Sequence, residues 1–243
     1  LFILLLALGG QAWQILSKTA YRHLDAAFKH LGLAPIPGEP HGVSRLRNDL
    51  FWQAAVYGHA PATEEAAAGF QALSAGREVH PNVLRGVMQA AAYNGDESTF
   101  KMLIDRMANS ESEQDRINSL RALGCFSDAE LIAEALSYVL NHVPDRNKFI
   151  PVSQMASNPK AVPMLWDWYA TNAEKFDAIH PIIHERIIAA VVPVGGLEST
   201  QEVAAYFEKH LSGSHTAADT IRMSLEKLEV NQRLRQHAMA AFG

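Results

Sequence analysis

The spacing of apolar residues along the chain predicts helices almost everywhere. One clear stretch begins at Leu131, where the apolar side chains fall on a single helical face and do not alternate as in a strand. Its members are Leu131, Ile132, Ala135, Leu136, Val139 and Leu140. Comparable stretches follow one another between Phe70 and Leu123. Only Ile187 to Val194 is ambiguous between helix and strand. The pattern therefore predicts an all-α fold.

Prolines, glycines and serines mark the expected helix ends. A first helical turn tolerates proline, because its N–H is not needed there. We expect this role for Pro61, Pro81 and Pro159. Glycine favours the left-handed position that follows a helix. We expect this role for Gly58, Gly76, Gly95 and Gly124. Ser127 to Glu130 and Ser199 to Glu202 have the form of a capping box, in which the serine accepts from free N–H groups.

The loops between successive helices are short, so neighbouring helices should run antiparallel. A long series of such pairs predicts an α-solenoid, a superhelix of the HEAT or armadillo type, whose repeat is structural and not visible as a sequence period. We expect one helical-repeat domain over residues 1–243. The segment 33–42, rich in proline and glycine, is the main interruption and a candidate hinge.

Composition narrows the class of protein. A chain of 243 residues with 48% hydrophobic and 19% charged residues can bury a sizeable core, and its mean hydropathy of -0.06 argues against a disordered or membrane protein. The net charge of -5 argues against nucleic-acid binding. The one cysteine, Cys125, excludes an internal disulfide framework and zinc sites built on several thiolates. Together with the absence of a recognisable signal, it favours the cytoplasm.

The first residues are strongly apolar. Leu1 to Leu8 lacks the basic flank of a signal peptide and is much shorter than the roughly 20 residues of a membrane-spanning helix. We therefore expect a buried helix and no membrane partner. The chain opens on Leu1 and not on Met, which favours a piece of a longer protein.

The sequence offers few candidates for chemistry. His180, His184 and Glu185 place two histidines at i and i+4, but a zinc peptidase helix reads H-E-x-x-H, and Pro181 favours a helix that only begins there. Ordinary helix-start and surface histidines are the alternative to a metal site. Cys125 is either a nucleophile or, as we favour, a small buried hydrophobe. No phosphate loop, G-x-G-x-x-G or G-x-S-x-G motif occurs. We expect no catalytic or metal-binding residues in this chain.

Aromatic and basic residues are the remaining candidates for binding. Trp166 to Tyr169 can line a peptide groove, although such a stripe is more often part of the core. Arginines occur on several predicted helices, and one or two of them can hold a carboxylate while the others are solvated or cap helices. They are Arg45, Arg47, Arg116, Arg121, Arg146 and Arg186.

Several short stretches, in a shared order, resemble one known family. Gly38-Glu39 followed by Ser44 to Arg47 resembles its "gE … lLR" opening, and Arg116 to Cys125 resembles its "r-l-aLg" helix. Ala156 to Pro159 and the following Trp166 resemble "a-NP … aW", whereas Pro144 to Asn147 departs from the "R-x-Q-D" that precedes it. The family is the C-terminal helical domain of the zinc aminopeptidases of the aminopeptidase N, puromycin-sensitive and endoplasmic-reticulum types.

The resemblance implies a bowl of helix pairs that covers an upstream catalytic domain and encloses part of a peptide-binding cavity. The motif H-E-x-x-H and the G-x-M-E-N loop of such enzymes are absent from this chain, so zinc belongs to the parent enzyme and the chain is inactive alone. Its partners are then the upstream domain and peptide substrates. Arg146 and Arg186 are candidates to face the cavity and meet a peptide carboxylate, with exposed or helix-capping arginines as the alternative.

Two other hypotheses stay open at this point. A freestanding helical-repeat scaffold for a protein partner predicts an initiator methionine close to Leu1. A small metalloenzyme that uses His180, His184 and Glu185 predicts bound metal in the isolated chain.

Overall fold

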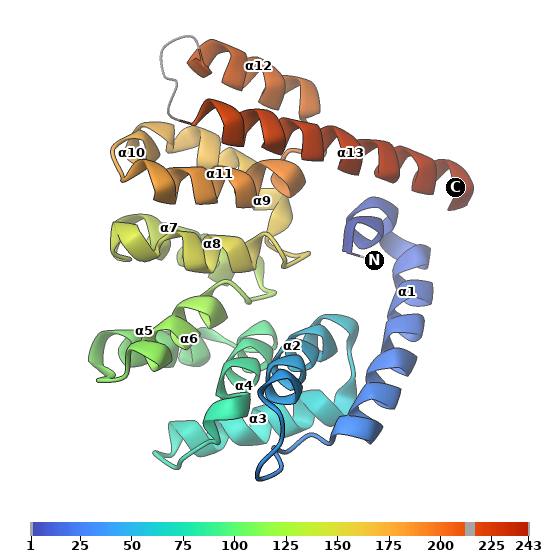
Figure 1. Cartoon of the computed structure of the whole chain (residues 1–243), viewed down its shortest axis with the longest axis vertical. Helices are drawn as coiled ribbons and strands as arrows, with labels where there is room; N and C mark the ends of the chain where they lie inside the picture. Colours follow the sequence, from blue (N-terminus) through green and yellow to red (C-terminus); the bar gives the residue numbers. More distant parts are fainter. Residues whose placement is uncertain (1, 212–216, 243) are drawn as a thin grey trace. The chain divides into compact units, whose positions relative to one another are not determined.

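The computed structural model describes residues 2–211 and 217–242 (Figure 1). The described residues contain helices and no strand, which confirms the all-α prediction. The helices are α1 (Phe2–Leu31), α2 (His41–Tyr57), α3 (Ala60–Ser74), α4 (Pro81–Tyr93), α5 (Glu97–Asn109), α6 (Glu113–Leu123), α7 (Ala129–Asn141), the 3-10 helix η1 (Asp145–Asn147), α8 (Phe149–Met155), α9 (Val162–Thr171), α10 (Ala173–Asp177), α11 (Pro181–Gly195), α12 (Thr200–Leu211) and α13 (Ala218–Phe242).

The contacts divide the chain into two compact units. The N-terminal unit consists of Gln14–Ile132, and the C-terminal unit consists of Ala133–Gly243 together with Leu1–Trp13. The two boundaries fall inside α1 and α7. The α-solenoid and the single domain over residues 1–243 remain predictions.

In the N-terminal unit, α2, α4 and α6 lie next to one another in that order (Figure 1). Contacts between α2 and α4 advance in the same direction along both helices, from Ser44–Asn82 to Trp52–Tyr93. The α2 and α4 helices therefore run parallel. Their buried side chains, among them Phe51, Trp52 and Met88, form the core with α3 and α5.

In the C-terminal unit, α11 lies at the centre, in contact with α8, α9 and α13 (Figure 1). Ile187, Ile188, Val191 and Val192 are each at most 1% exposed. A helix with neighbours on several sides needs apolar residues around much of its circumference. This explains why Ile187 to Val194 was ambiguous from sequence: the segment is helical and continues through Pro193.

Some of the predicted helix ends are confirmed and others are wrong. Pro61 and Pro81 lie in the first turns of α3 and α4, but Pro159 precedes α9, whose first turn contains Pro163. Gly58 and Gly76 have positive φ angles of 72° and 71°. Gly124, by contrast, follows α6 with a φ of -81°, and Gly95 is not among the positive-φ residues.

The capping box expected at Ser127 is also wrong in detail. The side chain of Asp128 accepts hydrogen bonds from the N–H groups of Glu130 and Leu131, so Asp128 caps α7. Ser127 instead donates from Oγ to the carbonyl of Tyr93, 2.6 Å away. Serine and aspartate can both cap a helix. Ser127 does not do so here because its hydroxyl donates to the carbonyl of Tyr93 at the end of α4. Ser199 immediately precedes α12, and its carbonyl accepts from Val203.

The apolar start is helical from Phe2, as expected. Its described side chains, Phe2, Ile3, Leu4 and Leu6, are half-buried and not fully buried. The rest of that prediction, Leu1 and the side chains at 5, 7 and 8, lies outside the described residues. Among the described helices, none is both long and apolar enough to span a membrane.

Candidate functional site

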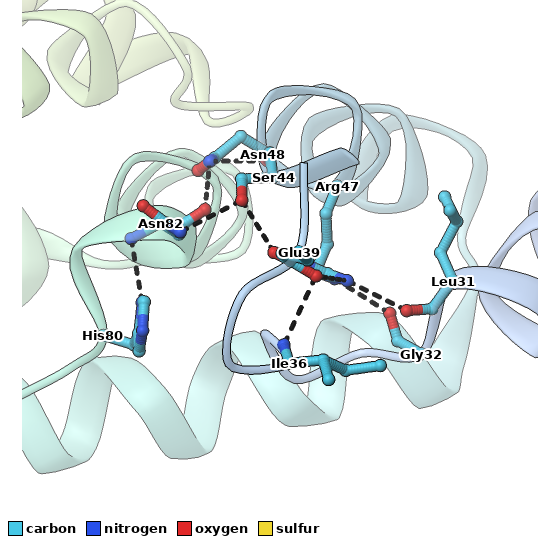
Figure 2. Close-up of polar contacts among 9 residues, drawn as sticks. All are labelled: Leu31, Gly32, Ile36, Glu39, Ser44, Arg47, Asn48, His80 and Asn82. Atoms are coloured by element: carbon cyan, nitrogen blue, oxygen red, sulfur yellow. Dashed lines mark hydrogen bonds and ion pairs between the residues drawn. The ribbon is translucent and has the colours of Figure 1, made fainter. Parts of the chain in front are cut away.

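A buried ion pair anchors the loop between α1 and α2. Arg47, whose side chain is fully buried, meets both carboxylate oxygens of Glu39, at 2.6 and 2.7 Å (Figure 2). Its remaining N–H groups donate to the carbonyls of Leu31 and Gly32. The hydrogen bonds from Arg47 and Ser44 lower the pKa of Glu39 to about 2. Arg47 therefore holds the end of α1 and is not available to a ligand.

Asn48 extends this network into α4 (Figure 2). Its Nδ2 donates to the carbonyl of Asn82, and its Oδ1 accepts from the N–H of Gly86 at 2.6 Å. One carboxamide thus contacts two peptide groups that are four residues apart in α4. The helices approach closely because Gly86 has no side chain. A Cβ there would lie 2.9 Å from the carbonyl oxygen of Asn48 and from Cβ of Phe51.

The Glu39–Arg47 pair and the Asn48 contacts are structural. They fix α2 against α1 and α4 and hold the segment 33–42 at Glu39, which also accepts from the N–H of Ile36. The motif that resembles "gE … lLR" corresponds to this pair, so the sequence identified the residues but not what they do. The hinge at 33–42 remains a prediction.

Arg186, one of the two predicted peptide-binding residues, lies on α11. Its guanidinium carbon is 4.6 Å from the centre of the Phe149 ring, in a cation–π contact. No ion pair of Arg186 occurs among the described residues. It lines a shallow groove of about 480 Å³ between α8 and α11 with Phe149, Ser153, Ala156, Ser157, Ala189 and Ala190. A cation above a floor of small side chains can hold the carboxylate of an extended peptide.

Arg146, the other predicted peptide-binding residue, lies in η1 and is exposed. The 3-10 helix contacts α8 and α11, so both arginines lie on neighbouring elements of the C-terminal unit. Arg146 does not line the groove of Arg186. The structure therefore brings the two arginines onto one group of helices but not into one site.

His180, His184 and Glu185, which were considered as metal ligands and not favoured, contact three different partners. Nδ1 of His180 accepts from the N–H of Ile182 and caps α11, while Glu185 accepts from the hydroxyl of Thr220. Nε2 of His184 lies 2.8 Å from the Tyr169 hydroxyl, and burial lowers the pKa of His184. Among the described residues, no three His, Cys, Asp or Glu side chains gather where they could hold a metal ion. These side chains do not fit a zinc site.

Cys125 has the surroundings of a buried hydrophobe. It is 0% exposed, its Sγ lies 3.8 Å from Nε2 of Gln89, and burial raises the pKa of its thiol. A protonated, inaccessible thiol is a poor nucleophile.

The aromatic cluster belongs to the core. Trp166 and Tyr169 are 3% and 2% exposed and lie against Phe207 of α12. Trp168 differs: it is half-buried and lines a groove of about 530 Å³ between α7 and α9.

Sequence reasoning missed two features of the polar residues. Histidine is the N-cap of α3, α4 and α11 through Nδ1 of His59, His80 and His180, each with proline in the first turn. The combination of histidine and a following proline is a local signal that could have revealed these caps. The ion pair between Arg85 and Asp49 joins α4 to α2, and no pattern in the neighbouring sequence predicts it.

Comparison with known proteins identifies relatives of this chain. Alanine/arginine aminopeptidase of Saccharomyces cerevisiae is 24% identical over 212 residues, which are 80% of this chain and 25% of that protein. Aminopeptidase 2 of Candida albicans is 27% identical over 164 residues, which are 65% of this chain and 17% of that protein. The chain thus spans a quarter or less of these relatives. A family model described as ERAP1-like C-terminal domain matches residues 4–230 and confirms the resemblance noted from sequence. The chain belongs to the ERAP1-like C-terminal domain family.

Proposed function

We propose that this chain is the C-terminal domain of a zinc-dependent aminopeptidase, where it covers the catalytic domain and forms part of the peptide-binding cavity. The match of the family over residues 4–230 carries the proposal. The names of the relatives, which are aminopeptidases, support the enzyme class. In this proposal the chain is not catalytic by itself, and the zinc ion and the hydrolytic residues belong to the upstream domain.

The groove beside Arg186 supports a role in peptide binding. Phe149 holds the guanidinium in place without neutralising it, so the positive charge remains available to an acidic group. Ser153 and Ser157 add hydroxyl groups to a floor of alanines, which leaves room for a peptide backbone. Exposed Arg146 is the second candidate to contact the peptide.

A second apolar face on α13 supports a protein partner. Ile221 and Leu228 are buried on the inner face, whereas Met223, Val230 and Leu234 are 55%, 56% and 43% exposed. Their spacing of seven and four residues places these three side chains on one face of the helix. Exposed apolar side chains that gather on one face are typical of an interaction surface. We assign this apolar face to the upstream catalytic domain. The cytoplasm remains a prediction for the compartment.

An activity assay on the isolated chain tests the absence of catalysis. We expect no release of product from alanine 4-nitroanilide or arginine 4-nitroanilide, with or without added zinc. Hydrolysis that co-purifies with the chain and is abolished by a chelator would contradict the proposal.

Kinetics of the parent enzyme test the contribution to peptide binding. The variant Arg186→Gln should raise KM for a long peptide by about threefold to tenfold, because it removes one charged contact. Hydrolysis of alanine 4-nitroanilide, which has no carboxylate for Arg186 to contact, should be unchanged. Arg77→Gln, an exposed arginine of the N-terminal unit, is the matched control. Equal KM values for the two variants would contradict a contact between Arg186 and the peptide.

A further inference from the structure

A histidine on α11 connects three consecutive helices of the C-terminal unit. Nε2 of His184 lies 2.8 Å from the hydroxyl oxygen of Tyr169 on α9. Nδ1 of the same ring lies 3.6 Å from Oδ1 of Asp177, the last residue of α10. Tyr169 is 2% exposed, whereas the side chain of Asp177 is 64% exposed. His184 therefore lies between a buried hydroxyl and a carboxylate at the surface.

These two contacts fit the neutral form of His184. A carboxylate beside Nδ1 favours the tautomer with its proton on Nδ1, so Nε2 accepts from the hydroxyl of Tyr169. Protonation adds a second N–H group, at Nε2. The hydroxyl of Tyr169 must then accept, and its own hydrogen needs a new acceptor. Among the described residues, this hydroxyl has no other hydrogen-bond partner.

The charged groups around His184 do not compensate for this loss. Asp177 and the adjacent Glu185 both favour the protonated ring, but water screens the exposed Asp177, and Glu185 also accepts from Thr220 of α13. Helix α8, which also contacts α11, has no titratable residue. Among the described residues, no charged group of η1, α12 or α13 acts on the ring. Burial outweighs the two carboxylates and lowers the pKa of His184.

Helix α10 is anchored by one of its side chains. Of its five residues, Phe176 alone is buried, at 1% exposed. The Phe176 ring stacks on the rings of Tyr169 and His184, with ring centres 5.4 and 6.2 Å apart. A short helix with one buried anchor opens at a lower cost in free energy than a helix with several buried turns. Helix α10 is therefore the neighbour of His184 that can move most easily.

We propose that protonation of His184 releases α10 from α9 and α11. While α10 stays in place, a protonated His184 is a poorly solvated cation beside a hydroxyl hydrogen without an acceptor. Once α10 has moved away, the imidazolium and the hydroxyl both reach water. Because the open form binds the proton more tightly, acid shifts the population toward it. This pH-sensitive device goes beyond the proposed function, since it requires neither the upstream domain nor a peptide.

Release of α10 also changes one wall of the groove between α7 and α9. The Trp168 ring, which lines this groove, meets the Phe176 ring edge-on, with ring centres 5.1 Å apart. When Phe176 leaves, this part of the indole becomes uncovered. Acid should therefore expose an aromatic surface that is covered at neutral pH.

Amide hydrogen exchange of the full 243-residue chain tests the release. Nuclear magnetic resonance at pH 5 and pH 7.5, on either side of the usual pKa of histidine, resolves single amides. The N–H groups of Phe176 and Ile179 report on α10, because they donate to the carbonyls of Asn172 and Phe176. After correction for the intrinsic effect of pH on exchange, their protection should fall several-fold at pH 5. The protection of Val191, which is buried in α11, should not change.

Three variants should change this pH dependence in three different ways. His184→Asn cannot gain the proton, so the protection of Phe176 should be equal at both pH values. Tyr169→Phe removes the hydroxyl hydrogen that protonation leaves without an acceptor, so the fall should become smaller. Asp177→Asn removes a charge that favours protonated His184, so the fall should become larger. The matched control is His142→Asn at an exposed histidine, which should behave like the original chain.

Two results would overturn the proposal. A fall in protection that persists in His184→Asn would assign the pH dependence to another group. A smaller fall in Asp177→Asn would mean that attraction to the carboxylate, and not loss of the Tyr169 contact, controls α10. The protection of Val191 shows whether each variant remains folded. If His184→Asn does not fold, the opposite changes expected for Tyr169→Phe and Asp177→Asn still decide the question.

Discussion

Arg47 and Arg186 carry the same charge in different surroundings. Arg47 is fully buried and its guanidinium meets Glu39 and two carbonyl groups, whereas Arg186 is exposed above the Phe149 ring. Burial of a cation without acceptors costs free energy, which a protein recovers through internal partners or through a ligand. Residue type alone therefore does not separate structural from binding arginines, and the acceptors around each guanidinium do.

Glu39 should make the stability of the chain depend on pH in the acid range. Its folded pKa of about 2 lies below its usual value of 4.5, so its contribution is complete above pH 4.5 and is lost as the pH falls toward 2. Glu39→Gln should lower the urea midpoint at pH 7 and flatten this dependence. Urea titrations between pH 2 and 7 measure both effects, with exposed Glu65→Gln as the control. A midpoint equal to that of the control would contradict the prediction.

His184 should titrate at a lower pH in the folded chain than in the unfolded chain. Burial favours its neutral form, so its contribution to stability is complete above the unfolded pKa of 6.5 and is lost as the pH falls from 6.5 to the lower folded value. Nuclear magnetic resonance of the imidazole ring measures the midpoint, and the same histidine in urea is the reference. A folded midpoint at or above the unfolded one would contradict the prediction.

At the scale of elements, the close approach of α2 and α4 depends on Gly86. Gly86→Ala should lower the free energy of unfolding by about 1–3 kcal/mol, because the added Cβ would lie 2.9 Å from the backbone of Asn48. The matched control is Gly42→Ala near the start of α2, where a Cβ has nothing within 4 Å. Urea unfolding should show no loss for the control. Equal stability of the two variants would mean that the helices are free to move apart.

The N-terminal cap of α11 provides a second test at the scale of elements. This test distinguishes a structural role of His180 from a role in metal binding. His180→Ala should cost about 1 kcal/mol, since the N–H of Ile182 loses its acceptor. His180→Asn should keep most of the stability because asparagine also caps helices. Thermal unfolding with and without zinc measures the effect. A loss that appears only when zinc is present would favour a metal ligand.

The helices were predictable because their signals are local. The spacing of apolar residues predicted α7, and Pro61 and Pro81 predicted the first turns of α3 and α4. The choice between Ser127 and Asp128 as a cap was not predictable, because it depends on a carbonyl of α4 that is 34 residues away. The ion pair of Arg85 with Asp49 was hidden for the same reason, because the register between α2 and α4 depends on contacts of Asn48 that only the fold creates.

At the scale of the whole molecule, removal of metal should leave the chain unchanged. Among the described residues, no three His, Cys, Asp or Glu side chains gather where they could hold a metal ion, so we expect stability not to depend on a bound ion. The Tm should agree before and after dialysis against a chelator, and addition of zinc should not raise it. A chelator-induced fall in Tm that zinc reverses would contradict this expectation.

Cys125 provides the molecule with a natural reporter of its own opening. It is the one cysteine of the chain, and it is buried where α4 meets α6. A thiol reagent can reach it only when this part of the structure opens, so the labelling rate measures how often the opening occurs. Local stability can therefore be followed in the native sequence, without an introduced probe.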